Sequence, residues 1–199
     1  MASKQRDRFP TQPSQTAATR ERAPRLEICI LAGGLSSRMG RDKSKLQLGG
    51  KSLLLHIRRT ARTLNIPVRI IRRDLVSRCG PLGGIYTALK TTSTDAVLFL
   101  ACDMPQVSES LLRNLLEHSA SRKKAIFTWS DDTAGFPFLL RREMLPVVEQ
   151  LLLDKNYSLQ ILAKETRAQQ FHPTRKFRLE LLNINTPADW HKLKEHFEK

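Results

Sequence analysis

The sequence predicts an α/β fold in which helices cover both faces of a mostly parallel sheet, giving three layers. Two observations support this prediction. Short apolar runs alternate with segments of helical periodicity along the chain, as expected when strands and crossover helices alternate. The runs are apolar at nearly every position, which is typical of parallel strands buried on both faces. The 199 residues suffice for one domain with a substantial core.

The first half of the chain contains two predicted strands and two predicted helices. Residues 28–32 form the first strand because they are apolar throughout. Ser52 can cap the next helix, whose inner face carries Leu54, Ile57, Ala61 and Leu64 at helical spacing. A short strand follows at residues 68–71. A second helix is expected from the Gly-Pro pair at 80–81 to about residue 90.

The second half begins with the clearest central strand, residues 96–101. Ser108 then starts a helix with its leucines at 111, 112, 115 and 116 directed inward. The remaining predicted elements are a strand at 124–129, an extended piece at 136–140, helices near 141–153 and 157–165, and a strand near 177–184. Thr186-Pro187 leads into a last helix, with a capping residue followed by proline at the first helical position.

The composition indicates a basic protein with an N-terminal tail. The formal net charge is +15, which favours anionic partners. Residues 1–25 hold six Arg or Lys and are rich in Gln, Thr, Ser and Pro, so we expect a disordered basic tail before a single domain at 26–199. No apolar run approaches membrane-spanning length. Three cysteines without a C-x-x-C pair favour a cytoplasmic location without disulfides. Nucleic-acid binding by the basic tail is the weakest of the functional hypotheses, since such a tail often serves only to keep a protein in solution.

A glycine-rich loop follows the first strand. Its sequence, residues 31–43, is L-A-G-G-L-S-S-R-M-G-R-D-K, with Gly33 and Gly34 near the strand and Arg38 and Lys43 further on. Glycines let backbone N–H groups approach phosphate oxygens, and the two cations neutralise them. The spacing fits neither a P-loop nor a dinucleotide-binding fingerprint. The alternative is an ordinary Gly-Gly turn.

Two aspartates follow strands at the same predicted edge of the sheet. Asp103 comes just after the strand 96–101 and precedes Met104-Pro105. It is either a turn or capping residue or a ligand of Mg²⁺, a metal held by one or two carboxylates together with substrate phosphates. Asp74 follows the strand 68–71 and could contact a ribose or a metal, or simply be solvated. Because ligands bind beyond the carboxyl ends of parallel strands, both could share a crevice with the glycine-rich loop.

The ordered motifs resemble those of the molybdenum cofactor guanylyltransferases. After the glycine-rich loop come G-P-L-G-G at 80–84, C-D-M-P at 102–105, Pro137 in its apolar strand and N-I-N-T-P at 183–187. The matches span about residues 26–195, so 26–199 is expected to be a single Rossmann-like nucleotidyltransferase domain. Guanylyl members tend to read L-A-G-G where cytidylyl members read L-A-A-G, which favours GTP.

This resemblance implies a reaction and a set of site residues. The reaction is Mg²⁺-dependent transfer of GMP from GTP to the terminal phosphate of molybdenum-molybdopterin, with release of pyrophosphate. The implied nucleotide contacts are Leu31, Ala32, Gly33, Gly34, Lys43, Asp74 and Asp103. Asp103 would also bind Mg²⁺, and Arg38 would join Lys43 on the β- and γ-phosphates. Molybdoenzymes or cofactor-insertion proteins are the implied protein partners.

The chain departs from the family pattern at residues 65–79. Family members usually place two strands in this interval, and the earlier one ends in an Asn that contacts the nucleotide. The interval here is long enough for one strand, so the sheet is expected to be one strand short. Two alternatives therefore stay open. One is a catalytically impaired homologue that binds the cofactor or a molybdoenzyme, and the other is a related nucleotidyltransferase with another nucleotide or acceptor.

Overall fold

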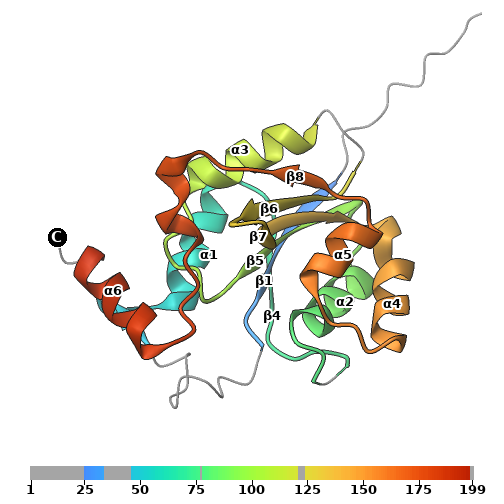
Figure 1. Ribbon diagram of the computed structural model, residues 1–199, viewed down its shortest axis with the longest axis horizontal. Coiled ribbons are helices and arrows are strands. Elements are labelled where there is room, and N and C mark those ends of the chain that lie inside the picture. Colours follow the sequence, from blue (N-terminus) through green and yellow to red (C-terminus); the bar gives the residue numbers. More distant parts are fainter. Residues whose placement is uncertain (1–24, 34–45, 77, 121–123, 198–199) are drawn as a thin grey trace, which may run out of the picture.

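A six-stranded sheet forms the centre of the computed structural model, which describes residues 25–33, 46–76, 78–120 and 124–197 (Figure 1). The strands lie in the order β4 (Val68–Ile71), β1 (Leu26–Leu31), β5 (Ala96–Ala101), β7 (Thr133–Arg141), β6 (Ile126–Ser130) and β8 (Gln169–Phe171). Strand β1 pairs in parallel with β4 and β5, and β6 pairs in parallel with β8. Strand β7 is antiparallel to both of its neighbours. The predicted mostly parallel sheet is confirmed.

Helices cover both faces of this sheet (Figure 1). One face carries α1 (Leu53–Thr63) and α3 (Glu109–Ala120). The other carries α2 (Pro81–Thr91), α4 (Leu145–Leu153), which follows a short 3₁₀ helix at Arg142–Met144, and α5 (Leu159–Glu165). The predicted three-layer arrangement is therefore confirmed. None of the described helices is long and apolar enough to cross a membrane.

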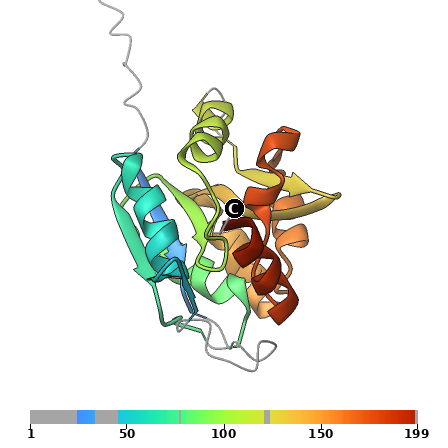
Figure 2. The same cartoon turned by 90° about the vertical axis from the view of Figure 1, so that its left-hand side faces the viewer.

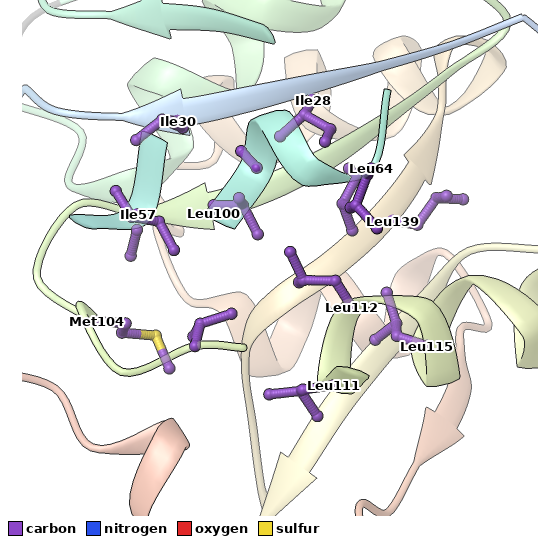
Figure 3. Close-up of a cluster of buried hydrophobic side chains, with 14 of the residues drawn as sticks. Ile28, Ile30, Ile57, Leu64, Leu100, Met104, Leu111, Leu112, Leu115 and Leu139 are labelled. Carbon is purple, nitrogen blue, oxygen red and sulfur yellow. The ribbon is translucent and has the colours of Figure 1, made fainter. Parts of the chain in front are cut away.

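Alternation along β1 divides the core into two. Ile28 and Ile30 point into the cluster beneath α1 and α3, where they join Ile57, Leu100 and Leu112 (Figure 3). Cys29 and Leu31 point into the cluster beneath α2, α4 and α5. Since both sets of side chains are buried, β1 has no solvent-facing side over Ile28 to Leu31. This double burial explains the uninterrupted apolar run in the sequence.

Aromatic stacking joins the three middle strands on the second face. The Phe138 ring of β7 stacks on Phe99 of β5 with centroids 5.0 Å apart and on Phe127 of β6 at 4.3 Å. All three rings are fully buried. Pairs of this kind stabilise a sheet beyond the area they bury. They hold the antiparallel strand β7 between two strands that run the other way.

A small hairpin and the last helix cover the start of α1. Strands β2 (Gln47–Leu48) and β3 (Lys51–Ser52) are joined by Gly49 and Gly50, both with positive φ, as a tight two-residue hairpin turn requires. Helix α6 (Pro187–Phe197) packs nearby, and its Leu193 shares a cluster with Leu48 and Leu53. Figure 2 looks onto this side of the molecule, with α6 in dark red and α1 in teal.

The C-terminal part of the chain departs from expectation. The strand predicted near 177–184 is wrong: the structure has two 3₁₀ helices there, Arg175–Phe177 and Leu179–Leu181. The apolar residues suggested a period of two, but Phe177 is buried while Leu179 and Leu182 are about half exposed, so no single face is formed. The strand that completes the sheet is β8, which lies earlier and was not predicted.

The interval between α1 and α2 forms a single strand, β4, over the residues described there. Strand β4 pairs directly with β1 and is the edge of the sheet. Arg69 anchors it, since its guanidinium lies 2.6 Å from a Glu27 carboxylate oxygen on β1 and donates to the Ala88 carbonyl on α2 at 2.9 Å. The predicted disordered tail lies outside the described residues except for Arg25, which pairs with Asp95.

We expect Ser52→Ala to destabilise the fold by about 1 kcal/mol because the Ser52 hydroxyl caps α1. In the structure this hydroxyl accepts a hydrogen bond from the Leu55 N–H at 3.2 Å. Ser158 stands at the same position before α5 but makes no side-chain capping bond, so Ser158→Ala is the matched control. Urea unfolding of both variants measures the difference. Equal losses in the two variants would contradict the capping role of Ser52.

Candidate active site

A cavity of about 730 Å³ opens at the carboxyl ends of the parallel strands. Its wall includes the ends of β1 and β5, the segments that follow β4 and β5, the start of α2, and the β6–β7 hairpin. The volume lies in the range of small-molecule binding sites. Five of the residues that the sequence predicts as nucleotide contacts line this cavity: Leu31, Ala32, Gly33, Asp74 and Asp103. The structure therefore brings these five predicted residues to one cavity.

The remaining predicted residues lie in the glycine-rich loop. Gly34, Arg38 and Lys43 are outside the described residues. The loop leaves the strand at Gly33, which lines the cavity.

Backbone hydrogen bonds continue the sheet one residue beyond the strand ends. The Ala32 N–H donates to the Ile71 carbonyl at 2.8 Å, and the Cys102 N–H donates to the Leu31 carbonyl at 3.1 Å. These bonds fix the residues immediately before Gly33 and Asp103. The positions of Gly33 and Asp103 thus follow from the pairing of β4, β1 and β5.

The C-terminal segment is tied to the same place. The Ile184 N–H donates to the Asp103 carbonyl at 2.9 Å, and the Ile184 side chain is buried against Leu48, Leu53 and Leu193. Asn183 and Asn185 on either side of Ile184 line the cavity. The N-I-N-T-P motif therefore belongs to the site, although it lies far from it in sequence.

Three glycines surround the Asp74 carboxylate. A Cβ atom on Gly83 would lie 3.0 Å from one carboxylate oxygen of Asp74 and 2.9 Å from the Val76 carbonyl oxygen. Cβ atoms on Gly84 and Gly33 would lie 3.4 and 3.6 Å from the other carboxylate oxygen. At Gly83 only glycine lets the first turn of α2 approach Asp74 this closely, whereas the distances at Gly84 and Gly33 are those of ordinary van der Waals contact with the carboxylate. Two of these glycines come from the G-P-L-G-G motif.

The segment after Asp74 is held against α2 by a buried threonine. The Thr87 hydroxyl accepts a hydrogen bond from the Leu75 N–H at 2.9 Å and donates to the Gly83 carbonyl at 2.8 Å. Burial raises the pKa of Asp74 above its usual 3.8. The packing against α2 thus positions Asp74, and the partial burial disfavours its ionised carboxylate.

Two carboxylates, Asp74 and Asp103, line the cavity. This donor set fits Mg²⁺, which takes one or two carboxylates and completes its shell with substrate phosphates and water. Within the described part of the chain, no group of three or more His, Cys, Asp or Glu side chains could hold a metal ion. The residues therefore suit a metal that arrives with a phosphorylated substrate rather than a closed structural site.

The other end of the cavity is lined by hydroxyl and amide side chains that the sequence analysis did not select. They are Thr128 and Ser130 of β6, Thr133 of β7, and Asn183 and Asn185. Thr128 and Ser130 are two residues apart, so they face the same side of β6. This spacing alone does not indicate a binding site unless the neighbouring strands are known. Arg72, two residues before Asp74, was also missed and lines the cavity beside β4.

Comparison with known proteins decides the family. A family model described as the MobA-like NTP transferase domain matches residues 28–74 and 63–170. The chain belongs to this family. The match begins within β1, ends within β8 and includes every described cavity residue before the C-terminal segment. Membership identifies the chain as a nucleotidyltransferase-type domain.

Individual relatives agree with this assignment of the MobA-like domain. The chain is 32% identical over 193 residues to a protein of Carboxydothermus hydrogenoformans named "Probable molybdenum cofactor guanylyltransferase", covering 86% of this chain and 96% of that protein. It is 30% identical to the molybdenum cofactor guanylyltransferase of Syntrophotalea carbinolica, covering 82% and 88%. The crystal structure of molybdopterin-guanine dinucleotide biosynthesis protein A from Archaeoglobus fulgidus has the same fold, with a TM-score of 0.69, 20% identity and coverage of 86% and 98%.

Gly83→Ala should destabilise the protein by roughly 1–3 kcal/mol because the added Cβ would overlap the Val76 carbonyl and the Asp74 carboxylate. In an unobstructed helix the same change stabilises by about 1 kcal/mol. Gly135→Ala is the control, since a Cβ there meets nothing within 4 Å. Denaturant unfolding separates the two variants. A stabilised Gly83→Ala protein would show that α2 does not approach Asp74 closely.

Asp74→Asn should weaken nucleotide binding without destabilising the protein at neutral pH. The folded-state pKa of Asp74 lies above 3.8, so the folded chain holds this proton at higher pH than the unfolded chain. The free energy of unfolding therefore falls as pH rises through the interval just above 3.8, and the loss persists at neutral pH. Thermal melting across this interval should show the variant gaining stability relative to wild type as pH rises. A growing deficit would contradict the assigned pKa direction.

Proposed function

We propose that the protein transfers GMP from GTP to the terminal phosphate of molybdenum-molybdopterin, forming the guanine dinucleotide cofactor and pyrophosphate. The observation that carries the proposal is that one cavity joins the end of β1, the Asp74 segment and Asp103. The names of its relatives support the choice of nucleotide and acceptor. GTP and molybdopterin are the proposed substrates, and a molybdoenzyme or an insertion protein is the proposed recipient of the product.

The proposed chemistry needs positioning and charge neutralisation. A terminal phosphate oxygen of the acceptor attacks the α-phosphorus of GTP, and the bond to the β-phosphate breaks as pyrophosphate leaves. With a second pKa of about 6, a phosphate monoester is largely an oxyanion near neutral pH. A dedicated general base is therefore unnecessary in this proposal.

The residues have separate roles in this reaction. Asp103 is the proposed ligand of Mg²⁺, with Asp74 on the same cavity wall as a nucleotide contact. When bound, Mg²⁺ would neutralise charge on the transferred phosphate and on the leaving pyrophosphate. Leu31, Ala32, Gly33 and Gly34 are proposed to contact the nucleotide through their backbone. Arg38 and Lys43 are proposed to hold the β- and γ-phosphates.

The decisive experiment incubates the purified protein with GTP, Mg²⁺ and molybdenum-molybdopterin. Chromatography with mass detection should show guanine dinucleotide formation together with pyrophosphate release. The Syntrophotalea carbinolica relative, run in parallel, establishes that the assay works. Failure of this chain to form product in an assay where that relative succeeds would reject the proposal.

Asp103→Asn should abolish turnover while leaving the fold intact, because a neutral amide oxygen is a much weaker ligand of Mg²⁺ than a carboxylate. We expect less than about a tenth of the wild-type rate, a loss of more than about 1.4 kcal/mol of transition-state stabilisation. Circular dichroism and thermal melting check the fold. Asp132→Asn, on the exposed β6–β7 turn, is the control and should keep full activity. A rate near wild type in Asp103→Asn would exclude the metal-ligand role.

The single strand between α1 and α2 favours a second candidate, a catalytically impaired homologue that binds the cofactor without transferring GMP. Isothermal titration calorimetry distinguishes the two. Retained molybdopterin binding with no GTP binding would favour the impaired homologue. A panel of nucleotides with Mg²⁺ would also reveal a related transferase that uses another nucleotide.

A further inference from the structure

The cavity extends to both sides of Asp103, and hydroxyl and amide side chains lie mainly on one of them. Strand β5, which leads to Asp103, lies between the β4–β1 pair and the β7–β6 pair. On the β6–β7 side the wall carries hydroxyls and amides, including Thr128, Ser130 and Asn183. Ala134 and Phe136 of β7 add apolar surface beside them. Such groups suit a polar acceptor that bears many hydrogen-bonding atoms. The transferred phosphate at Asp103 joins this acceptor to the nucleoside, so the nucleoside is left with the β4–β1 end.

The β4–β1 end suits a flat, partly apolar ring. Ala32, Pro81 and Gly84 supply small or apolar surfaces there. Among the described residues, the charged ones that line this end are Arg72 and Asp74. Arg73, between them in sequence, is exposed and does not line the cavity.

The backbone of Arg72 lies beside Gly33. The carbonyl oxygen of Arg72 would lie 3.2 Å from a Cβ atom on Gly33, so the two segments are in contact. The residue before it, Ile71, accepts the Ala32 N–H at 2.8 Å. Arg72 is therefore presented from a rigid strand end rather than from a free loop.

Arg72 is exposed and lines the cavity, and no ion pair or hydrogen bond of its side chain occurs within the described residues. Arg69, three residues earlier on the same strand, is by contrast occupied by Glu27, Ala88 and Thr91. A guanidinium offers donors in a rigid fork and no acceptor. It therefore selects a partner that presents two adjacent acceptors.

We infer that Arg72 recognises the guanine base of the nucleotide by donating two hydrogen bonds to its O6 and N7 atoms. These atoms are both acceptors in guanine, whereas adenine replaces O6 with an amino donor. Among the described residues that line the cavity, Arg72 is the one arginine or lysine. This assignment rests on the proposed use of GTP and names a specificity residue for it.

Calorimetric binding of GTP, ATP and 7-deaza-GTP with Mg²⁺ tests the assignment. The wild type should bind GTP more tightly than either analogue, since 7-deaza-GTP lacks the N7 acceptor. Arg72→Ala should weaken GTP binding by about tenfold, leave ATP binding nearly unchanged, and remove the difference between GTP and 7-deaza-GTP. Arg72→Lys keeps the charge but not the fork, so it should lose most of the same discrimination.

Arg73→Ala is the matched control, because it removes an adjacent arginine that does not line the cavity. It should keep GTP affinity within about twofold of wild type. Equal weakening of GTP and ATP by Arg72→Ala would overturn the inference and assign the arginine to the phosphates. Unchanged GTP binding in that variant would overturn it as well. A wild-type protein that binds no GTP would instead overturn the proposed function, and this inference with it.

Discussion

The close approach of three backbone segments around Asp74 is the constraint on which the site depends. The end of β1, the segment after β4 and the first turn of α2 converge there, and a side chain on Gly33, Gly83 or Gly84 would occupy the space between them. Pairing of β1 with β4 and β5 sets the first two segments, and the hydrogen bonds of Thr87 set the third. The glycines are therefore needed for packing before any ligand binds. Their presence in the sequence motifs is therefore explained by packing alone, before any role in ligand binding is considered.

Much of the sheet could be predicted because its inner strands are buried on both faces. The residues of β5 and β4 were predicted with the observed bounds, and β1 with a shift of its ends. Elements at the edges gave weaker signals. Strand β8 contains two glutamines and a single buried residue, Phe171, so nothing in its sequence distinguishes it from a loop. The leucines near residue 180 alternate as in a strand, but tertiary packing buries only part of that segment, which folds as 3₁₀ turns.

The residues of the candidate site likewise fall into those that the sequence predicts and those that it does not. Gly33, Asp74 and Asp103 could be predicted because each follows an apolar strand that runs in the same direction, so their meeting follows from the fold class. Arg72 and the hydroxyls of β6 have no such signal. Arginine is abundant in this chain, and Thr128 or Ser130 becomes informative only when β6 is known to lie two strands from β5. The sheet order, which local sequence does not encode, assembles this half of the wall.

The reversed direction of β7 has a consequence for how such proteins diversify. Because β6 and β7 are joined by a turn at Asp131 and Asp132, both with positive φ, two adjacent strands contribute side chains to the same rim. The stacked Phe127, Phe99 and Phe138 rings anchor these strands beneath it. Mutations could therefore remodel the rim without disturbing the opposite half, which depends on β4, β1 and α2. Substitutions confined to the β6–β7 rim would change what this part of the cavity binds while the part built by β4, β1 and α2 stays the same.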